Sequence, residues 1–221
     1  MAILAIVLPL AVFAPLAVRA WQNDVFAWDE QLSSFIHAYQ NRETIWNSRV
    51  DVFDAVLRPG FQFVGAVVVL TVLAAMLLRE RLRAALFIAL GVGGAAVLGV
   101  FLKEVFAQPP VDAGSGGGYS FPSGHAVRSM AVAAVLVVLA WPTRWRWPSV
   151  LVGAVVVALV GVAVVYHEWH WVSDVLAGWA IAVAWVGCVW LALSGPFRVT
   201  SPSRYAGSDG RKLARPGPHI P

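Results

Sequence analysis

The sequence is poor in cysteine and in charge. Its single cysteine, Cys188, lies within an apolar run, so the chain cannot form an intramolecular disulfide. Charged residues make up only 13% of the 221 residues, whereas 59% are hydrophobic, and the mean hydropathy is +0.73. A typical soluble domain has about 25% charged residues. The composition therefore excludes an ordinary soluble domain and indicates an integral membrane protein.

The hydrophobic residues gather in runs that are long enough to cross a membrane. A hydrocarbon core of about 30 Å requires about 20 apolar residues in a helix. Five runs contain no Asp, Glu, Lys or Arg, and a sixth contains only Arg128; in chain order they are residues 1–18, 60–78, 84–102, 126–143, 148–166 and 175–197. We expect an all-α polytopic bundle of six transmembrane helices. The first run has no basic residues before it and contains Pro9 and Pro15, so we expect a span rather than a signal peptide.

The remaining segments differ in composition from the runs. Residues 19–59 mix aromatic and charged side chains, which predicts an extracytoplasmic amphipathic segment with one or two interfacial helices. Residues 60–197 would form the five-helix remainder of the core. Residues 198–221, rich in Pro, Gly, Ser and basic groups, predict a disordered cytoplasmic tail.

The distribution of Lys and Arg predicts the orientation. Short loops with many basic residues face the cytoplasm. The loops after the second and fourth runs are rich in arginine, whereas the loop after the fifth run contains no Lys or Arg. We therefore expect both termini in the cytoplasm, and the end of the third run, the start of the fourth and the loop between the fifth and sixth on the extracytoplasmic face of the plasma (inner) membrane.

A first polar cluster, the segment YSFPSGH at residues 119–125, opens the fourth run. Polar groups at the mouth of a membrane span are costly to desolvate and mark a functional site by default. Ser123 and Gly124 come directly before an apolar helix, whose free N–H groups and dipole favour an anion. His125 can exchange a proton near neutral pH. These residues indicate a phosphoryl group or another oxyanion as ligand.

A second cluster, His170 with Asp174, has the spacing of an oriented imidazole. If the segment is helical, residues four apart lie on one face, and the carboxylate can hold one ring nitrogen while the other points outward. Each residue alone has a plainer explanation, because an interfacial histidine is often an anchor and Ser-Gly is often a helix cap. Their combination favours a catalytic site.

Together these residues match a known pattern. Lys103 ends the third run, Pro-Ser-Gly-His opens the fourth, and His-x-x-x-Asp precedes the sixth. Over residues 60–195, this order and spacing resemble the type 2 phosphatidic acid phosphatase family of membrane lipid phosphatases. The resemblance implies a lipid phosphate substrate, no metal or other cofactor, and no nucleic-acid partner.

The resemblance also implies a role for each residue. The histidine matching His170 attacks phosphorus to give a phosphohistidine, the aspartate matching Asp174 orients it, and the histidine matching His125 protonates the leaving alcohol. Lys103, Ser123 and the backbone of Gly124 would bind the phosphate oxygens, which agrees with the argument from the helix terminus.

The chain departs from the family pattern at two places. The Arg-Pro pair expected after Lys103 is replaced by Pro110 and Val111, and the arginine expected six residues before His170 is replaced by Val164. Removing one such phosphate donor typically costs roughly 10²–10³ in rate. Arg128 lies three residues after His125, and two hypotheses stay open for it: it restores part of the lost charge, or it snorkels or pairs elsewhere in the bundle.

Other functions are compatible with parts of the sequence. A catalytically weak relative would bind lipid phosphate without efficient turnover. Vanadium haloperoxidases share the core motifs but use a full basic clamp, and a transporter would leave the paired clusters unexplained. The segment His167–His170 contains two histidines, but their spacing of three differs from the zinc-protease pattern. The leading hypothesis is a hydrolase of lipid phosphate monoesters or polyprenyl pyrophosphates.

Overall fold

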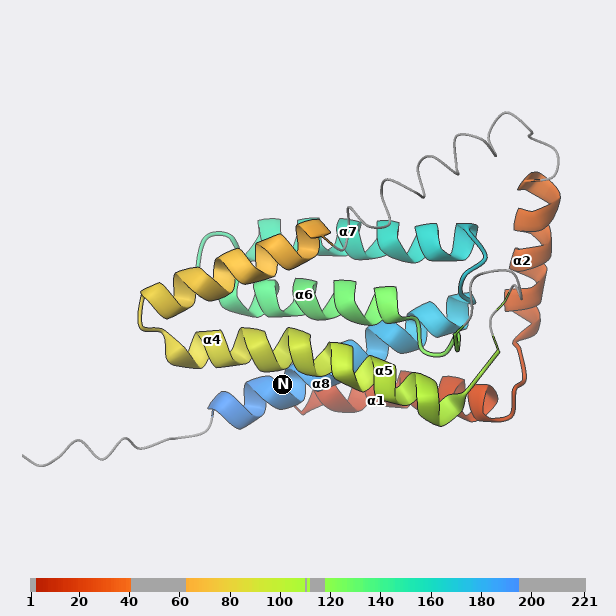
Figure 1. The fold of residues 1–221 in the computed structure, drawn as a ribbon, viewed down its shortest axis with the longest axis horizontal. Coiled ribbons are helices and arrows are strands. Elements are labelled where there is room, and N and C mark those ends of the chain that lie inside the picture. Colours follow the sequence, from red (N-terminus) through yellow and green to blue (C-terminus); the bar gives the residue numbers. More distant parts are fainter. Residues whose placement is uncertain (1–2, 41–62, 110, 112–117, 195–221) are drawn as a thin grey trace, which may run out of the picture.

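The computed structural model describes residues 3–40, 63–109, 111 and 118–194, and all regular structure in these residues is helical (Figure 1). The expected all-α class is confirmed. In chain order the helices are α1 (Leu4–Trp21), α2 (Ala27–Gln40), an unlabelled helix (Phe63–Leu78), α4 (Leu82–Ile88), the π-helical turn η1 (Ala89–Gly93), α5 (Gly94–Phe106), α6 (Gly124–Ala140), α7 (Arg146–Tyr166) and α8 (Val172–Ser194).

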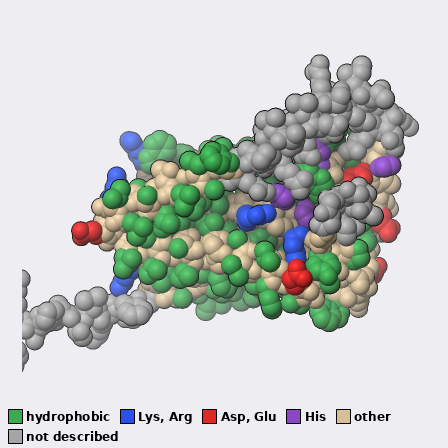
Figure 2. Space-filling view, in the orientation of Figure 1, with side chains coloured by type: hydrophobic (Ala, Val, Ile, Leu, Met, Phe, Trp, Pro, Cys, Tyr) green, Lys and Arg blue, Asp and Glu red, His purple; other side chains and the backbone are tan. Residues whose placement is uncertain are grey.

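Four of the described helices are long and apolar enough to cross a membrane: Leu4–Trp21, Leu82–Phe106, Arg146–Tyr166 and Val172–Ser194. Two further apolar helices are shorter, Phe63–Leu78 and Gly124–Ala140. Every expected run is thus helical over most of its described length, while the count of six spans stays a prediction. Many large hydrophobic side chains are exposed, and they are spread along the face of the bundle seen in Figure 2, as a lipid-facing surface requires.

Helix α8 is the centre of the bundle, and it packs against α1 and α6. Its buried face is built largely from alanine and glycine, which allow close approach between membrane helices. At Gly178 a Cβ atom would lie 2.9 Å from both the Ala126 Cβ and the Ser123 carbonyl oxygen. Glycine at this position therefore lets the start of α6 lie directly against α8.

The helix formed by α4 and α5 is interrupted by the π-helical turn η1. The Leu90 carbonyl within this turn accepts a hydrogen bond from the Trp185 indole N–H of α8 at 2.9 Å. A Cβ atom at Gly94 would lie 2.5 Å from the same indole ring. The π-helical turn thus supplies a hydrogen-bond acceptor for Trp185, and Gly94 leaves space for its indole ring.

Helix α2 lies across one end of the bundle, roughly perpendicular to the long helices (Figure 1). It buries Asp29 on its inner side and exposes Phe35 and Tyr39. The sequence predicts that this segment rests on a membrane surface, and that remains a prediction. The second half of the segment, residues 41–59, and the expected tail at 198–221 lie outside the described residues.

Candidate active site

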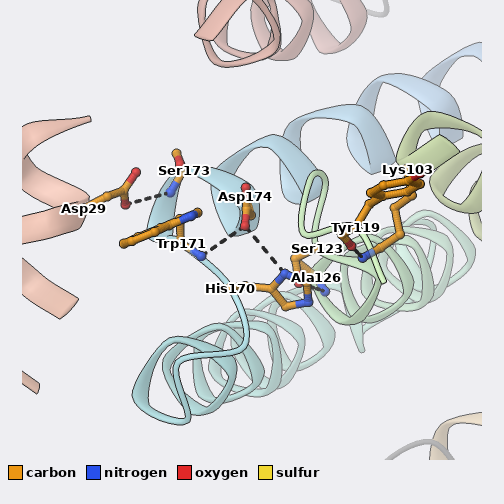
Figure 3. Close-up of polar contacts among 9 residues, drawn as sticks. All are labelled: Asp29, Lys103, Tyr119, Ser123, Ala126, His170, Trp171, Ser173 and Asp174. Atoms are coloured by element: carbon orange, nitrogen blue, oxygen red, sulfur yellow. Dashed lines mark hydrogen bonds and ion pairs between the residues drawn. The ribbon is translucent and has the colours of Figure 1, made fainter. Parts of the chain in front are cut away.

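The two polar clusters of the sequence meet at the end of the bundle that α2 covers (Figure 3). The His125 and His170 rings lie 6.3 Å apart, centroid to centroid. The Ser123 amide donates a hydrogen bond to the Asp174 carbonyl at 3.1 Å. A direct backbone contact therefore joins two motifs that are about fifty residues apart in the sequence.

His170 and Asp174 face each other, but not because both lie on a helix. α8 begins at Val172, and His170 lies in the loop that precedes it, so the condition that one helix carries both residues is not met. The His170 Nδ1 lies 3.6 Å from the Asp174 Oδ2, an ion-pair distance rather than a hydrogen bond.

Asp174 also closes the first turn of α8. Its Oδ2 accepts the Trp171 amide at 3.0 Å, in the way that an acidic residue at the third helical position reaches back to the residue before the helix. The carboxylate is fully buried, whereas the His170 side chain is 9% exposed. One oxygen atom thus fixes the turn and faces the imidazole.

The end of α7 fixes the backbone of His170. The Val164 carbonyl accepts the amides of Trp169 at 3.1 Å and His170 at 3.3 Å, and the Glu168 amide donates to Val165 at 3.0 Å. This is the hydrogen-bond pattern of a Schellman motif, whose left-handed residue is usually glycine. Here that residue is Glu168, with φ of 55°. This left-handed residue lies two positions before His170, and such backbone strain is often found at functional sites.

The start of α6 supplies an N-terminus at the same place. Ser123 is its N-cap, fully buried, and its Oγ accepts the Ala126 amide at 3.4 Å. Ser123 therefore acts as a helix cap in this structure, which is the plainer of its two explanations. Contact between Ser123 and a phosphate oxygen stays a prediction.

Two cations lie beside Gly124. A Cβ atom at this residue would be 3.5 Å from the Arg128 Nη2 and 3.7 Å from the Lys103 Cε. The Lys103 ammonium donates to the Tyr119 carbonyl, and the Arg128 Nε donates to the Gly124 carbonyl at 3.0 Å. Both positive charges therefore lie at the N-terminus of α6.

One of the two positions that lack an expected arginine is described by the structure. Val164 is buried against Ala126 and Val175. Pro110 lies outside the described residues, and Val111, which follows it, lines a small pocket beside His170. An arginine at position 164 would bring a charge into an apolar cluster.

Asp29 was not predicted as a site residue. It lies on α2, is 2% exposed, and its Oδ1 accepts the Ser173 amide at 3.2 Å. Burial raises the pKa of its carboxyl above the ordinary value of 3.8, and the nearby Asp174 adds to the rise. The sequence offers only an acidic residue among aromatic ones, 144 residues before its partner, so no local pattern connects them.

An aromatic cluster holds the YSFPSGH segment. The Phe121 ring lies 4.9 Å from the Phe106 ring and 5.8 Å from the Phe13 ring, centroid to centroid. The last turn of α5, which also bears Lys103, and helix α1 are thereby packed against this segment. Over the described residues, no three His, Cys, Asp or Glu side chains come together in a way that could hold a metal ion.

Comparison with known proteins shows the family of this chain. The family model of the PAP2 superfamily matches residues 84–196, more than half of the chain. The chain belongs to the PAP2 superfamily. The resemblance drawn from Lys103, the Pro-Ser-Gly-His segment and the His-x-x-x-Asp segment is thereby confirmed.

Two relatives extend the comparison. An undecaprenyl-diphosphatase of Sulfolobus acidocaldarius is 35% identical over 82 residues, which are 36% of this chain and 37% of that protein. The chain thus matches little more than a third of this relative's length. The crystal structure of a transmembrane PAP2-type phosphatidylglycerolphosphate phosphatase from Bacillus subtilis has a TM-score of 0.68 and 20% identity, covering 86% of this chain and 98% of that one. The likeness shows a shared fold, and with the apolar helices it supports an integral membrane protein.

Proposed function

We propose that this chain is a membrane lipid phosphatase that hydrolyses a lipid phosphate monoester or a polyprenyl pyrophosphate through a phosphohistidine intermediate. The observation that carries the proposal is the meeting of His125, His170 and Asp174 with two cations at one helix N-terminus. The superfamily match and the diphosphatase relative support the same reaction class.

In the proposed mechanism His170 is the nucleophile. Its Nδ1 faces Asp174, so Nε2 attacks phosphorus; an N–P bond forms while the P–O bond to the lipid breaks. His125 gives its proton to the leaving lipid oxygen and then takes one from the water that hydrolyses the phosphohistidine. Asp174 holds the imidazole and stabilises the positive charge that develops on it.

The phosphoryl oxygens would lie at the start of α6. Lys103, Arg128 and the backbone of Gly124 are the proposed donors, with the hydroxyl of Ser123 as a fourth. They act without a metal ion in this proposal, since two cations and a helix N-terminus can stabilise the charge on the transferred group. Arg128 replaces part of the charge that the missing arginines supply in the family.

The proposed placement in the membrane follows from the loop charges. All six apolar helices span the bilayer, both termini are cytoplasmic, and the site faces the extracytoplasmic side of the plasma membrane. The units are the first helix at 1–18, the amphipathic segment at 19–59, the core at 60–197 and a cytoplasmic tail at 198–221. A lipid could then keep its tail in the bilayer while its phosphate reaches His170.

The test is a phosphate-release screen with purified protein in lipid micelles. Undecaprenyl pyrophosphate, phosphatidic acid and phosphatidylglycerol phosphate are offered to the wild type and to His170→Ala. We expect release from at least one lipid and its loss in the variant, by a factor of roughly 10³ or more. The control Arg146→Gln, at the opposite end of α7, should release phosphate at the wild-type rate.

The same screen identifies the alternative. Binding of lipid phosphate without release by the wild type would indicate the catalytically weak relative, which the missing arginines favour. A release rate that is equal in His170→Ala and the wild type would overturn the assigned nucleophile.

A further inference from the structure

The contact between α2 and the first turn of α8 has no place in the mechanism above. α2 reaches the site from a segment that precedes the family-matched core by more than forty residues. It meets the loop between α7 and α8 twice: Asp29 accepts the Ser173 amide at 3.2 Å, and the His37 Nδ1 lies 3.4 Å from the Glu168 Oε2. The two contacts lie on either side of His170 in the sequence.

The N-cap residue of α8 has no capping side chain. The residue before it is Trp171, which has no side-chain acceptor for the free N–H groups of the first turn. Asp29 supplies that acceptor from another helix, and Ser173 is 7% exposed. A buried amide without a partner would destabilise this turn considerably, so the carboxylate has a definite energetic role.

The turn that Asp29 caps is the one that bears Asp174. Ser173 and Asp174 are consecutive, and the Asp174 Oδ2 accepts the Trp171 amide while facing His170. Figure 3 shows the resulting series from Asp29 through Ser173 and Asp174 to His170. A shift of this turn would change the separation between the carboxylate and the imidazole, which is already 3.6 Å.

We propose that Asp29 is a positioning residue for phosphoryl transfer: by accepting the Ser173 amide, it holds the first turn of α8, and with it Asp174, against His170. The inference rests on the proposed function. It assigns α2 to the active site, although the family-matched residues begin only at Ala84.

The second oxygen of Asp29 distinguishes this role from that of a simple structural cap. The Asp29 Oδ2 is buried without a hydrogen-bond partner among the described residues, and Asp29 lines the small pocket that also contains Glu168 and His170. A purely stabilising group would gain by pairing both oxygens. The Asp29 carboxyl is held by the Ser173 amide, and hydrogen bonds with the Ser173 side chain and the Val172 backbone also act on it, so these bonds tie it to the first turn of α8.

The test compares three variants at neighbouring positions. Asp29→Leu keeps the approximate size but removes the acceptor, Asp29→Asn keeps an acceptor oxygen, and Glu30→Leu makes the same change at the exposed neighbouring carboxylate. We expect Asp29→Leu to lower kcat by about 10- to 100-fold with KM within about twofold. Asp29→Asn should restore most of kcat, and Glu30→Leu should match the wild type. Rates are normalised to folded protein measured by size-exclusion chromatography.

Each result has a definite meaning. Wild-type kcat per folded enzyme in Asp29→Leu overturns the inference, as does an equal loss in Asp29→Asn and Asp29→Leu. If the wild type releases no phosphate from any lipid, the proposed function fails instead. The positioning contact is then measured by hydrogen exchange, where Asp29→Leu but not Glu30→Leu should speed exchange of the Ser173 amide.

Discussion

The two halves of the candidate site are held in different ways. In the nucleophile half, the His170 and Asp174 side chains are almost fully buried. Backbone amides around them donate hydrogen bonds to the Val164 carbonyl and to the Asp29 and Asp174 carboxylates, and these bonds fix the chain. In the phosphate half, Lys103 and Arg128 reach Gly124 with long side chains that donate to main-chain carbonyls. The backbone around the proposed nucleophile is therefore fixed, whereas the proposed phosphate-binding cations are held by contacts that a phosphate oxygen can replace.

The departures from the family pattern fall in the half that is held loosely. The residues of the catalytic pair are all present, whereas the missing arginines belong to the phosphate clamp. The proposed nucleophile cannot change its position in the sequence unless the buried turn that holds it is rebuilt. A cationic group on a long side chain can instead be supplied from another position on a neighbouring helix. Arg128 on α6 is such a position.

The largest expected effect breaks the nucleophile half. Asp174→Asn keeps an acceptor for the Trp171 amide, so the fold should persist, but it removes the charge that stabilises the imidazolium. We expect kcat to fall by roughly 10⁴, as in other His–Asp pairs. Phosphate release and the melting temperature are measured together, with Glu104→Gln on α5 as the matched surface control. A loss below tenfold would contradict the assigned role.

A smaller effect is expected in the phosphate half. Lys103→Met should lower kcat/KM by roughly 10²–10³, because it removes a phosphate donor. Arg128→Gln should lower kcat/KM less, by about tenfold. Arg128→Lys should recover part of this loss because it keeps the positive charge, but not all of it, because an ammonium cannot make the two parallel contacts of a guanidinium. Unchanged phosphate binding in Arg128→Gln would show that this arginine only anchors the bundle.

The smallest effect concerns stability and pH. Because burial raises the Asp29 pKa above 3.8, the folded state holds this proton more tightly than the unfolded chain. The contribution to stability is therefore present at low pH and is lost as the pH rises from the ordinary value through the raised one. Asp29→Asn cannot ionise, so its melting temperature relative to the wild type should increase over that range.

The rest of the chain is identical in the two proteins. Because Asp174 interacts electrostatically with Asp29, the difference between the two curves reports the Asp29 carboxyl together with that interaction. Parallel curves from pH 4 upward would show that Asp29 is ionised in the fold at its ordinary pKa.

The sequence predicts much of the fold because hydrophobic runs determine membrane helices strongly. It also predicts which motifs meet, since the runs bring the end of α5, the start of α6 and the α7–α8 loop to one end of the bundle. The spacing of His170 and Asp174 is less informative. Four residues suit a helix, but the same separation arises here from a loop followed by a first helical turn.

Other features depend on contacts that no local pattern reveals. Asp29 meets Ser173 only because α2 folds across the end of the bundle. The π-helical turn at Ala89–Gly93 receives a hydrogen bond from the Trp185 indole of another helix. The sequence predicts neither, because each results from tertiary packing rather than from propensity.

The π-helical turn determines the direction, about the helix axis, in which the side chains of α5 point. A π-turn holds one residue more than an α-turn, and each residue of an α-helix advances the chain by about 100°. Deleting one residue between Ala89 and Gly93 would leave the apolar composition unchanged but turn Lys103 away from Gly124. The number of residues in this segment therefore determines the direction in which Lys103 points from the helix axis. We expect an insertion or deletion here to impair the site more than most single substitutions do.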